Sequence, residues 1–292
     1  MKVKLKISYL LLVITCLMGS FTLTPRQARA ATKFQVVNVT NTTKKVGDVT
    51  FSSQYAQSDS RWNVYYKKGD KKELLTTQNG ISTIIMTDGK IVYYSVANSS
   101  NMNEYCTDTI YKKILSTGQT RKLFSVKNEY YFSFVGYYQE KIYYIKNLDP
   151  GTLCSYDLKT GKNKSLLKNV TGVDQYGSVF LCTPYEGGGG PFEFTTYNAK
   201  TNKSKILTKS MMNYKVIKKQ VYYVEYVRSY DNSEYILYND YICNVVRCDL
   251  NGKNKKVLLK NQRIKGYVDK ITSSYLTYKN YDSNKTYKIK YK

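Results

Sequence analysis

The sequence predicts an all-β protein built from a repeated four-stranded antiparallel unit, and three observations lead to this prediction. A phrase of alternating strand residues recurs, as in Lys-Ile-Tyr-Tyr-Ile at 141–145 and Gln-Val-Tyr-Tyr-Val at 220–224. Tight turns recur every 40 to 51 residues, each followed by an apolar pair. Tyrosine is abundant, with 32 residues against nine phenylalanines and one tryptophan. This suits strands, in which one ring face packs and the hydroxyl reaches solvent.

The recurring turns set the register of the repeat. They are centred on Gly69, Gly118, Gly161, Thr201 and Gly252. The apolar pairs that follow five and six residues later are Leu74-Leu75, Leu123-Phe124, Leu166-Leu167, Ile206-Leu207 and Val257-Leu258. A period of about 40–50 residues with several short strands is typical of a propeller blade. One such blade cannot cover both of its faces, so neighbouring blades must stack to bury them.

The repeat divides the chain after residue 30 into six units, whose strands we letter A to D from the inner edge outward. The expected units are 33–78, 81–126, 130–169, 170–210, 211–261 and 262–292. In the first unit, strand A is expected near 33–37, B at 49–53, C at 62–67 and D at 73–76. In the fifth unit, A is expected near 214–219, B at 220–224, C at 241–250 and D at 256–260.

The sixth unit has expected strands at 263–269, 274–279 and 286–292 and no D strand of its own. Either this blade is short, or residues 33–38 pair there and close the ring. We therefore predict one six-bladed β-propeller of four-stranded antiparallel blades over residues 31–292. Five or seven blades are the alternatives, and a two-sheet sandwich is disfavoured because sandwiches do not repeat one strand phrase so regularly.

The first 30 residues have the pattern of a signal peptide. Three early lysines precede an apolar run over 7–23, and Ala28-Arg29-Ala30 gives small residues at the positions that a signal peptidase reads. Cleavage is expected before Ala31. A retained membrane anchor and a lipoprotein modified at Cys16 are the alternatives. We therefore expect a secreted or otherwise extracytoplasmic protein, with cell-wall association as one option and no stable membrane span after cleavage.

Four features of the repeat resemble a known family. They are the Ile-Tyr-Tyr phrase, an Asp-Leu near the end of strand C (157–158 and 249–250), an Asn-Gly-Lys turn at 251–253, and the Leu-Leu that follows. They resemble the bacterial low-density-lipoprotein-receptor-like propellers of unknown function, which are related in architecture to TolB-type six-bladed propellers. The Tyr-Trp-Thr-Asp tetrad of the receptor propellers is absent. The resemblance implies an extracytoplasmic six-bladed ring with no assigned catalytic residues.

The net charge is +25, and +20 once the first 30 residues are removed. Such a charge favours anionic surroundings such as wall polymers. The lysines are scattered through every repeat and form no dedicated arm, and lysine rather than arginine dominates. Readers of nucleic-acid sequence rely on the bidentate contacts of arginine, so specific nucleic-acid binding is not expected.

The chain contains no histidine, which excludes Ser-His, Cys-His and His-metal sites. Five cysteines follow the signal peptide, and no CxxC pair is present. The sequence indicates no catalytic residue, no metal and no cofactor. Cys182 and Cys248 lie within expected strands and are expected to be buried free thiols. The sequence does not decide whether two of the three cysteines Cys106, Cys154 and Cys243 form a disulfide.

The connections between strands B and C vary most, and in a propeller they emerge on one rim. They are rich in tyrosine, asparagine and acid, which suits the binding of protein or glycan surfaces. The expected ligand-binding residues are Tyr105, Tyr185, Glu186, Tyr226, Arg228, Tyr230, Asp231, Glu234, Tyr235, Tyr238 and Asp240.

We therefore expect a secreted, non-catalytic binding module for a protein or an anionic cell-envelope polymer, working through the B–C rim. One alternative is an enzyme that cleaves carbohydrate or peptide bonds with loop carboxylates, such as Glu186 with Glu193 or Asp231 with Glu234. The other is a structural or accessory propeller. The glycines at 187–190 do not form a phosphate-binding loop, because no strand-loop-helix context or Lys-Ser/Thr follows them.

Overall fold

The computed structural model describes residues 34–56, 61–79, 83–98, 105–129, 132–147, 151–183, 192–230 and 240–291. Every helix or strand assigned in these ranges is a β-strand, and paired strands run antiparallel. The prediction of an all-β antiparallel fold is confirmed. These ranges hold no helix that is long and apolar enough to span a bilayer. The expected signal peptide lies outside the described residues.

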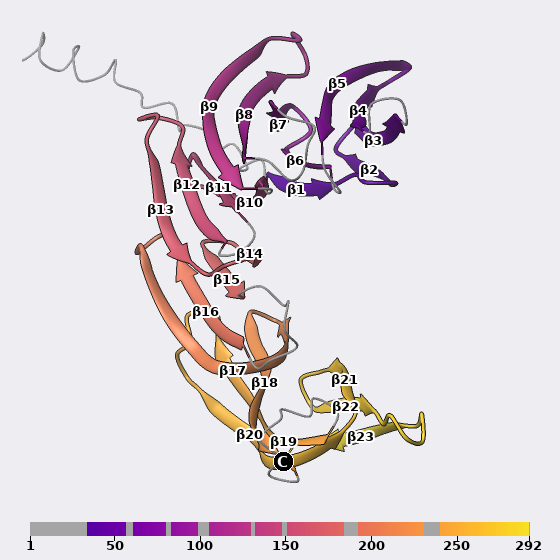
Figure 1. The fold of residues 1–292 in the computed structure, drawn as a ribbon, viewed down its shortest axis with the longest axis vertical. Coiled ribbons are helices and arrows are strands. Elements are labelled where there is room, and N and C mark those ends of the chain that lie inside the picture. Colours follow the sequence, from indigo (N-terminus) through magenta and orange to yellow (C-terminus); the bar gives the residue numbers. More distant parts are fainter. Residues whose placement is uncertain are drawn as a thin grey trace, which may run out of the picture. The chain divides into compact units, whose positions relative to one another are not determined.

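The first two units are antiparallel meanders (Figure 1). The first sheet contains β2 (Thr43–Val46), β3 (Val49–Ala56), β4 (Arg61–Lys68) and β5 (Lys71–Asn79). The second contains β1 (Gln35–Asn38), β6 (Ile84–Thr87), β7 (Ile91–Ala97), β8 (Tyr105–Ile114) and β9 (Thr120–Glu129). Except for β1, each strand pairs with its neighbours in the chain, as expected of units that form locally.

The third unit is a four-stranded meander, whereas the fourth and fifth are joined. The third contains β10 (Phe132–Tyr138), β11 (Lys141–Lys146), β12 (Thr152–Asp157) and β13 (Asn163–Lys168). The joined sheet contains β14 (Gly172–Tyr176), β15 (Val179–Thr183), β16 (Phe192–Asn198), β17 (Lys203–Ile217), β18 (Gln220–Ser229), β19 (Asp240–Asp249) and β20 (Lys256–Lys265). The 15-residue strand β17 pairs with β16 through 203–211 and with β18 through 211–217. It is therefore both the outer strand of the fourth unit and the inner strand of the fifth.

The sixth unit has three strands, β21 (Tyr267–Ile271), β22 (Tyr275–Lys279) and β23 (Thr286–Lys290). Of the two alternatives for this unit, the short blade is the one observed. The other alternative is wrong, because residues 35–38 pair with β6 of the second unit, with Gln35 opposite Thr87 and Asn38 opposite Ile84. For the same reason, residues 33–37 are not the inner strand of the first unit. That place is taken by β2, which forms a hairpin with β3 around Gly47.

Each apolar pair that marks the repeat coincides with a β-bulge in the outer strand. In the first unit Leu74 pairs with Tyr65 and Thr76 pairs with Val64, so Leu75 is the extra residue. The corresponding extra residues in the next four units are Leu123, Leu166, Leu207 and Leu258. A bulge re-aims the side chains around it and increases the local twist of an edge strand. The apolar pair therefore marks a bulge in the fourth strand of each of these five units.

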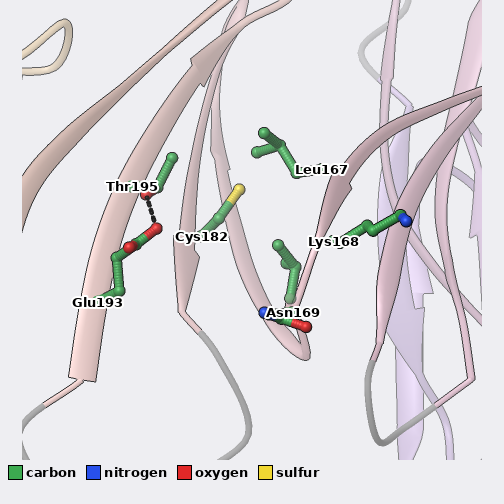
Figure 2. A pocket seen from close by; sticks show the side chains of 7 residues that line it. Leu167, Lys168, Asn169, Cys182, Glu193 and Thr195 are labelled. Atoms are coloured by element: carbon green, nitrogen blue, oxygen red, sulfur yellow. Dashed lines mark hydrogen bonds between the residues drawn. The ribbon is translucent and has the colours of Figure 1, made fainter.

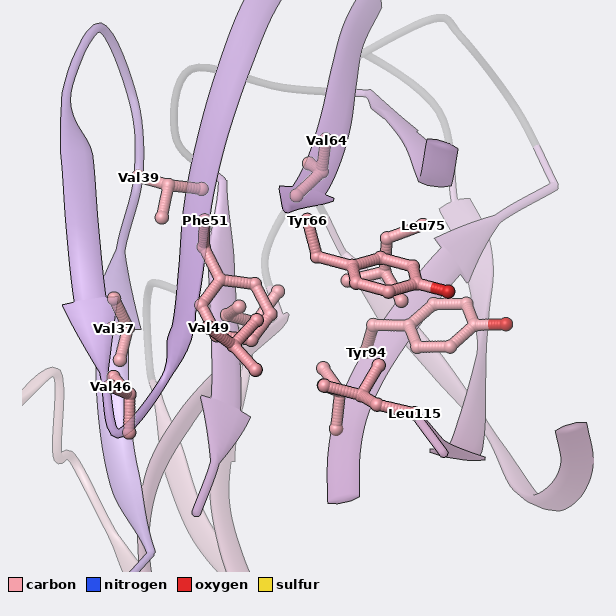
Figure 3. Packing of buried hydrophobic residues seen from close by; sticks show 12 residues of the cluster. Val37, Val39, Val46, Val49, Phe51, Val64, Tyr66, Leu75, Tyr94 and Leu115 are labelled. Atoms are coloured by element: carbon pink, nitrogen blue, oxygen red, sulfur yellow. The ribbon is translucent and has the colours of Figure 1, made fainter. Parts of the chain in front are cut away.

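The hydrophobic core is divided among five clusters, each lying between consecutive units. The first cluster lies between the first and second units and includes Phe51, Tyr66 and Tyr94 (Figure 3). The other four clusters join the second unit to the third, the third to the fourth, the fourth to the fifth, and the fifth to the sixth. Several tyrosines are fully buried, although the sequence led us to expect their hydroxyls in solvent. The hydroxyl of Tyr223, for example, donates to the Leu207 carbonyl at 3.3 Å.

The cysteines Cys154, Cys182, Cys243 and Cys248 are buried free thiols. The expectation for Cys182 and Cys248 is confirmed, and a Cys154–Cys243 bridge is excluded. The side chain of Cys106 lies outside the described residues. Burial raises the pKa of Cys182 and of Cys243 to about 12. These thiols are therefore neutral and unreactive in the folded protein at neutral pH.

We expect stability to fall in alkaline solution because of these buried thiols. The ordinary pKa of a cysteine is 9.0, so the unfolded chain loses these protons first as the pH rises, while the folded chain keeps them. The free energy of unfolding should therefore be insensitive to the two thiols below pH 9 and decrease from there toward about 12. Urea denaturation at a series of pH values measures this. A Cys182→Ala, Cys243→Ala variant should show a shallower alkaline decrease, and an unchanged slope would contradict the assignment.

Candidate functional site

The B–C end of the units is the region that the sequence predicts to bind ligand, and the structure describes the strand ends that border it. A pocket of about 190 Å³ lies near the end of β15 and the start of β16. Its lining residues are Leu167, Lys168, Asn169, Val170, Cys182, Glu193 and Thr195 (Figure 2). The pocket therefore lies between the outer strand of the third unit and the two middle strands of the fourth.

One wall of this pocket is formed by the end of β13 and the residues that follow it, and backbone geometry holds that wall in place. Asn169 has a φ of 57°, in the left-handed region, and turns the chain toward β14. The Val170 amide then donates to the Gly151 carbonyl at 3.0 Å. Only glycine fits at position 151, because a Cβ there would lie 2.1 Å from the Val170 carbonyl oxygen. Gly151 thus anchors this wall to the start of β12.

The opposite wall is formed by Cys182, Glu193 and Thr195 of β15 and β16. Thr195 donates to the Glu193 carboxylate at 3.1 Å, and Thr195 pairs with Cys182 across β15 and β16. The Cys182 thiol is buried and has a raised pKa, so it packs rather than acting as a nucleophile. Glu193 is exposed at the mouth and is the one acid of the proposed Glu186–Glu193 pair that the structure describes. The pocket can accept a small polar group from a larger ligand.

A second arrangement lies at the B–C end of the fifth unit, and we name it the Tyr230 cluster: Tyr230, Asp240 and Arg263. Arg263 donates to both carboxylate oxygens of Asp240, from Nε at 2.8 Å and from the second terminal nitrogen at 2.7 Å. Its guanidinium carbon lies 3.3 Å from the centre of the Tyr230 ring. The bond to Asp240 raises the pKa of Arg263. A bidentate pair stacked on a ring holds that ring in one orientation.

Neighbouring residues support the base of the same connection. Arg228 donates to the carbonyls of Ser229 and Tyr230, at 3.2 and 3.4 Å. The Tyr226 hydroxyl bonds the Ser229 hydroxyl at 3.0 Å. The Tyr230 amide donates to the Asp240 carbonyl at 3.2 Å, so pairing continues to the point where the two strands separate. Tyr230 remains 45% exposed and can contact a ligand.

The structure thus brings together four of the eleven predicted binding residues: Tyr226, Arg228, Tyr230 and Asp240. Six others, Tyr185, Glu186, Asp231, Glu234, Tyr235 and Tyr238, lie outside the described residues, and only the backbone of Tyr105 is described, in β8. Arg263 was missed, because the sequence places it in the sixth unit. The sequence did contain a signal for it, because Asp240 and Arg263 are 23 positions apart, a hairpin span that brings opposite charges together at one sheet end. The described residues contain no cluster of potential metal ligands.

No protein-family model matches the chain, and no curated protein matches it in sequence. Among solved structures, the β-propeller domain of the Trilobed protease from Pyrococcus furiosus is similar at a TM-score of 0.46 and 12% identity, covering 84% of this chain and 79% of that one. TolB from Acinetobacter baumannii is similar at a TM-score of 0.34 and 12% identity, covering 88% and 80%. Pyrococcus horikoshii acylaminoacyl peptidase is similar at a TM-score of 0.48 and 9% identity, covering 83% of this chain but 43% of that one. None of these similarities assigns a ligand or an activity to this chain.

Proposed function

We propose that the chain is an exported, non-catalytic six-bladed β-propeller that binds a partner protein at the B–C end of its blades. The six successive units, joined through five buried clusters, support the propeller architecture. The pattern of residues 1–30 supports export. The binding function depends above all on the Tyr230 cluster, in which an ion pair fixes an exposed aromatic ring. Rigid aromatic side chains of this kind dominate the energetics of protein interfaces.

The charge of the B–C end favours a protein over an anionic polymer as the partner. The six B–C connections with their flanks, residues 56–61, 97–108, 146–152, 183–193, 228–241 and 279–286, contain five basic and ten acidic residues. A polyanion would be repelled by this balance, whereas a protein can match it with basic side chains. We therefore propose that the partner of the B–C end is a protein rather than an anionic polymer.

The proposal is tested by placing a photo-crosslinking residue at position 230 and, separately, at position 74. Leu74 is 51% exposed on β5 and lies away from the B–C connections, so it is a matched control. In an envelope preparation from the source cells, adducts to one protein are expected from position 230 and not from position 74. The purified partner should then bind a Tyr230→Ala variant at least about tenfold more weakly. Equal crosslinking from both positions, or unchanged affinity of the variant, would contradict the proposal.

The alternative of a hydrolase makes a different prediction. Two carboxyl groups at a set separation are required to cleave a glycosidic bond. The Asp240 carboxylate is engaged by two hydrogen bonds from Arg263. Among the described residues, Glu193 is the acid that lines the pocket, so it is the residue to test. Turnover on a panel of wall glycans that disappears in a Glu193→Gln variant would support the enzyme and overturn the non-catalytic assignment.

A further inference from the structure

The basic residues that look scattered in the sequence gather at one end of the sheets. In each of the first five units, a C–D hairpin joins the third strand to the outer one, over residues 67–73, 112–122, 157–164, 198–205 and 247–256. These hairpins together contain 18 lysines and arginines and four acidic residues. The B–C connections at the other end of the strands show the opposite balance. The repeat therefore places a similar number of positive charges in the same position of each of these five units.

Most of this positive charge is exposed and lacks an acidic partner. Fifteen of the 18 basic residues are exposed. Among the described residues, four of the 18 form ion pairs: Lys68 with Asp48, Lys71 with Glu73, Lys159 with Glu140, and Lys255 with Glu225.

Two of the four acids of the hairpins, Asp157 and Asp249, stabilise the turns themselves. The Asp157 carboxylate accepts from the amides of Lys159 and Thr160, and the Asp249 carboxylate accepts from the amides of Asn251 and Lys253. These bonds close the turns, as aspartate does in many tight turns.

Successive hairpins are linked through contacts of their own residues or of the strand residues beside them, so their charges form a row. The Lys113 amine lies 5.0 Å from the ring centre of Tyr66 in the preceding unit. Tyr156 of the third unit donates to the Leu123 carbonyl of the second at 3.2 Å. Leu166 packs into the cluster that the third unit shares with the fourth. The Asn198 amide of the fourth unit donates to the Asn251 side chain of the fifth at 2.7 Å.

We propose that this row of five C–D hairpins, the basic edge, is a binding surface for a linear polymer of phosphate groups. A row of exposed charges fits a flexible chain that can follow it from hairpin to hairpin. The charges are almost all lysines, which bind phosphate as point charges without the fixed bidentate geometry of arginine. The turn tips carry Gly69-Asp70, Thr160-Gly161 and Asn251-Gly252, and no aromatic side chain that could insert into a lipid surface. This surface is separate from the Tyr230 cluster and goes beyond the function proposed for the B–C end.

Two variants that remove the same charge test the proposal. The hairpin variant replaces Arg121, Lys122, Lys162, Lys164, Lys200 and Lys203 with glutamine. The control variant replaces Lys127, Lys209, Lys260, Lys270, Lys285 and Lys290 with glutamine. All twelve side chains are exposed, and each variant loses six charges. Urea denaturation of both variants confirms that they fold.

The probe is long-chain inorganic polyphosphate, and its affinity is measured over a range of salt concentrations. The hairpin variant should bind polyphosphate at least about 30-fold more weakly near physiological salt. A plot of log affinity against log salt concentration should also be shallower by about 2 to 4, because each lost phosphate contact removes about 0.7 from its slope. The control variant should stay within about threefold of the unchanged protein. A Tyr230→Ala variant should bind polyphosphate normally, which separates this surface from the function proposed for the B–C end.

Three results would overturn the proposal. Equal losses in the hairpin and control variants would show that net charge alone attracts the polymer. Unchanged binding by the hairpin variant would place the polymer elsewhere. Tighter binding to phosphatidylglycerol vesicles than to polyphosphate would identify a lipid surface as the occupant of the basic edge.

Discussion

Replacing Phe180 with alanine is expected to lower the free energy of unfolding by about 3–5 kcal/mol. Phe180 on β15 is fully buried, and its ring centre lies 4.5 Å from that of Tyr143 on β11. Both belong to the cluster between the third and fourth units. Truncation removes apolar contacts and leaves a cavity at an interface on which both units depend, so neither unit can refill it alone.

Urea denaturation of the purified chain measures this loss. Val36→Ala serves as a control, because Val36 on the edge strand β1 is exposed, and its truncation should cost less than about 1 kcal/mol. If Phe180→Ala fails to fold, Phe180→Leu should give a smaller, measurable loss of about 1–2 kcal/mol. A loss for Phe180→Ala no larger than that for Val36→Ala would mean that this cluster does not hold the two units together.

Replacing Gly266 with alanine is expected to destabilise the chain by about 3–5 kcal/mol, because both backbone and space require glycine there. Gly266 joins β20 to β21 with a φ of +141°, a conformation that side-chain-bearing residues rarely adopt. A Cβ would also lie 1.9 Å from the Lys279 carbonyl oxygen. Because the sixth unit packs on the fifth through Ile264, Val268 and Leu276, displacement at this point disturbs their shared cluster.

Gly177→Ala isolates the conformational part of this effect. Gly177 has a φ of +66°, and a Cβ there would meet nothing within 4 Å, so its substitution should cost about 1–2 kcal/mol. Denaturation curves give the difference between the two variants, and limited proteolysis should cut Gly266→Ala faster near residues 266–280. Equal losses in both variants would show that the close approach to Lys279 is relieved without cost.

The strands of the repeat are predictable because their signals are local. The turns at Gly118 and Gly161 and the Ile-Tyr-Tyr phrase mark hairpins, whose partners are neighbours in the chain. The partner of β1 is not local, since nothing in residues 35–38 distinguishes an inner edge in the first sheet from one in the second. Strand β2 was missed because three of its four residues are exposed and two are lysines, so it shows no apolar alternation and is held by backbone pairing with β3.

The candidate site was predictable in position rather than in detail. The richness of the B–C connections in tyrosine and acid indicated Tyr226, Arg228, Tyr230 and Asp240. What orients Tyr230 is Arg263, which comes from the neighbouring strand and is brought into contact by the register of β19 with β20. The basic edge could not be recognised from the sequence. Lysines spread evenly along a sequence come together only when the repeat stacks them.

Strand β17 has a consequence for how the molecule opens. In most repeat arrays, adjacent repeats touch through side chains and can come apart while each keeps its own hydrogen bonds. Here Met211 is paired on both sides, so the fourth and fifth units cannot separate without breaking a continuous ladder. The two are therefore expected to unfold as one cooperative foldon. Among the described residues, the three-stranded C-terminal sheet shares no strand pairing with them and is joined by a packed cluster, the Lys265–Asp282 ion pair and the Asn213–Val268 hydrogen bond, so it can fray independently.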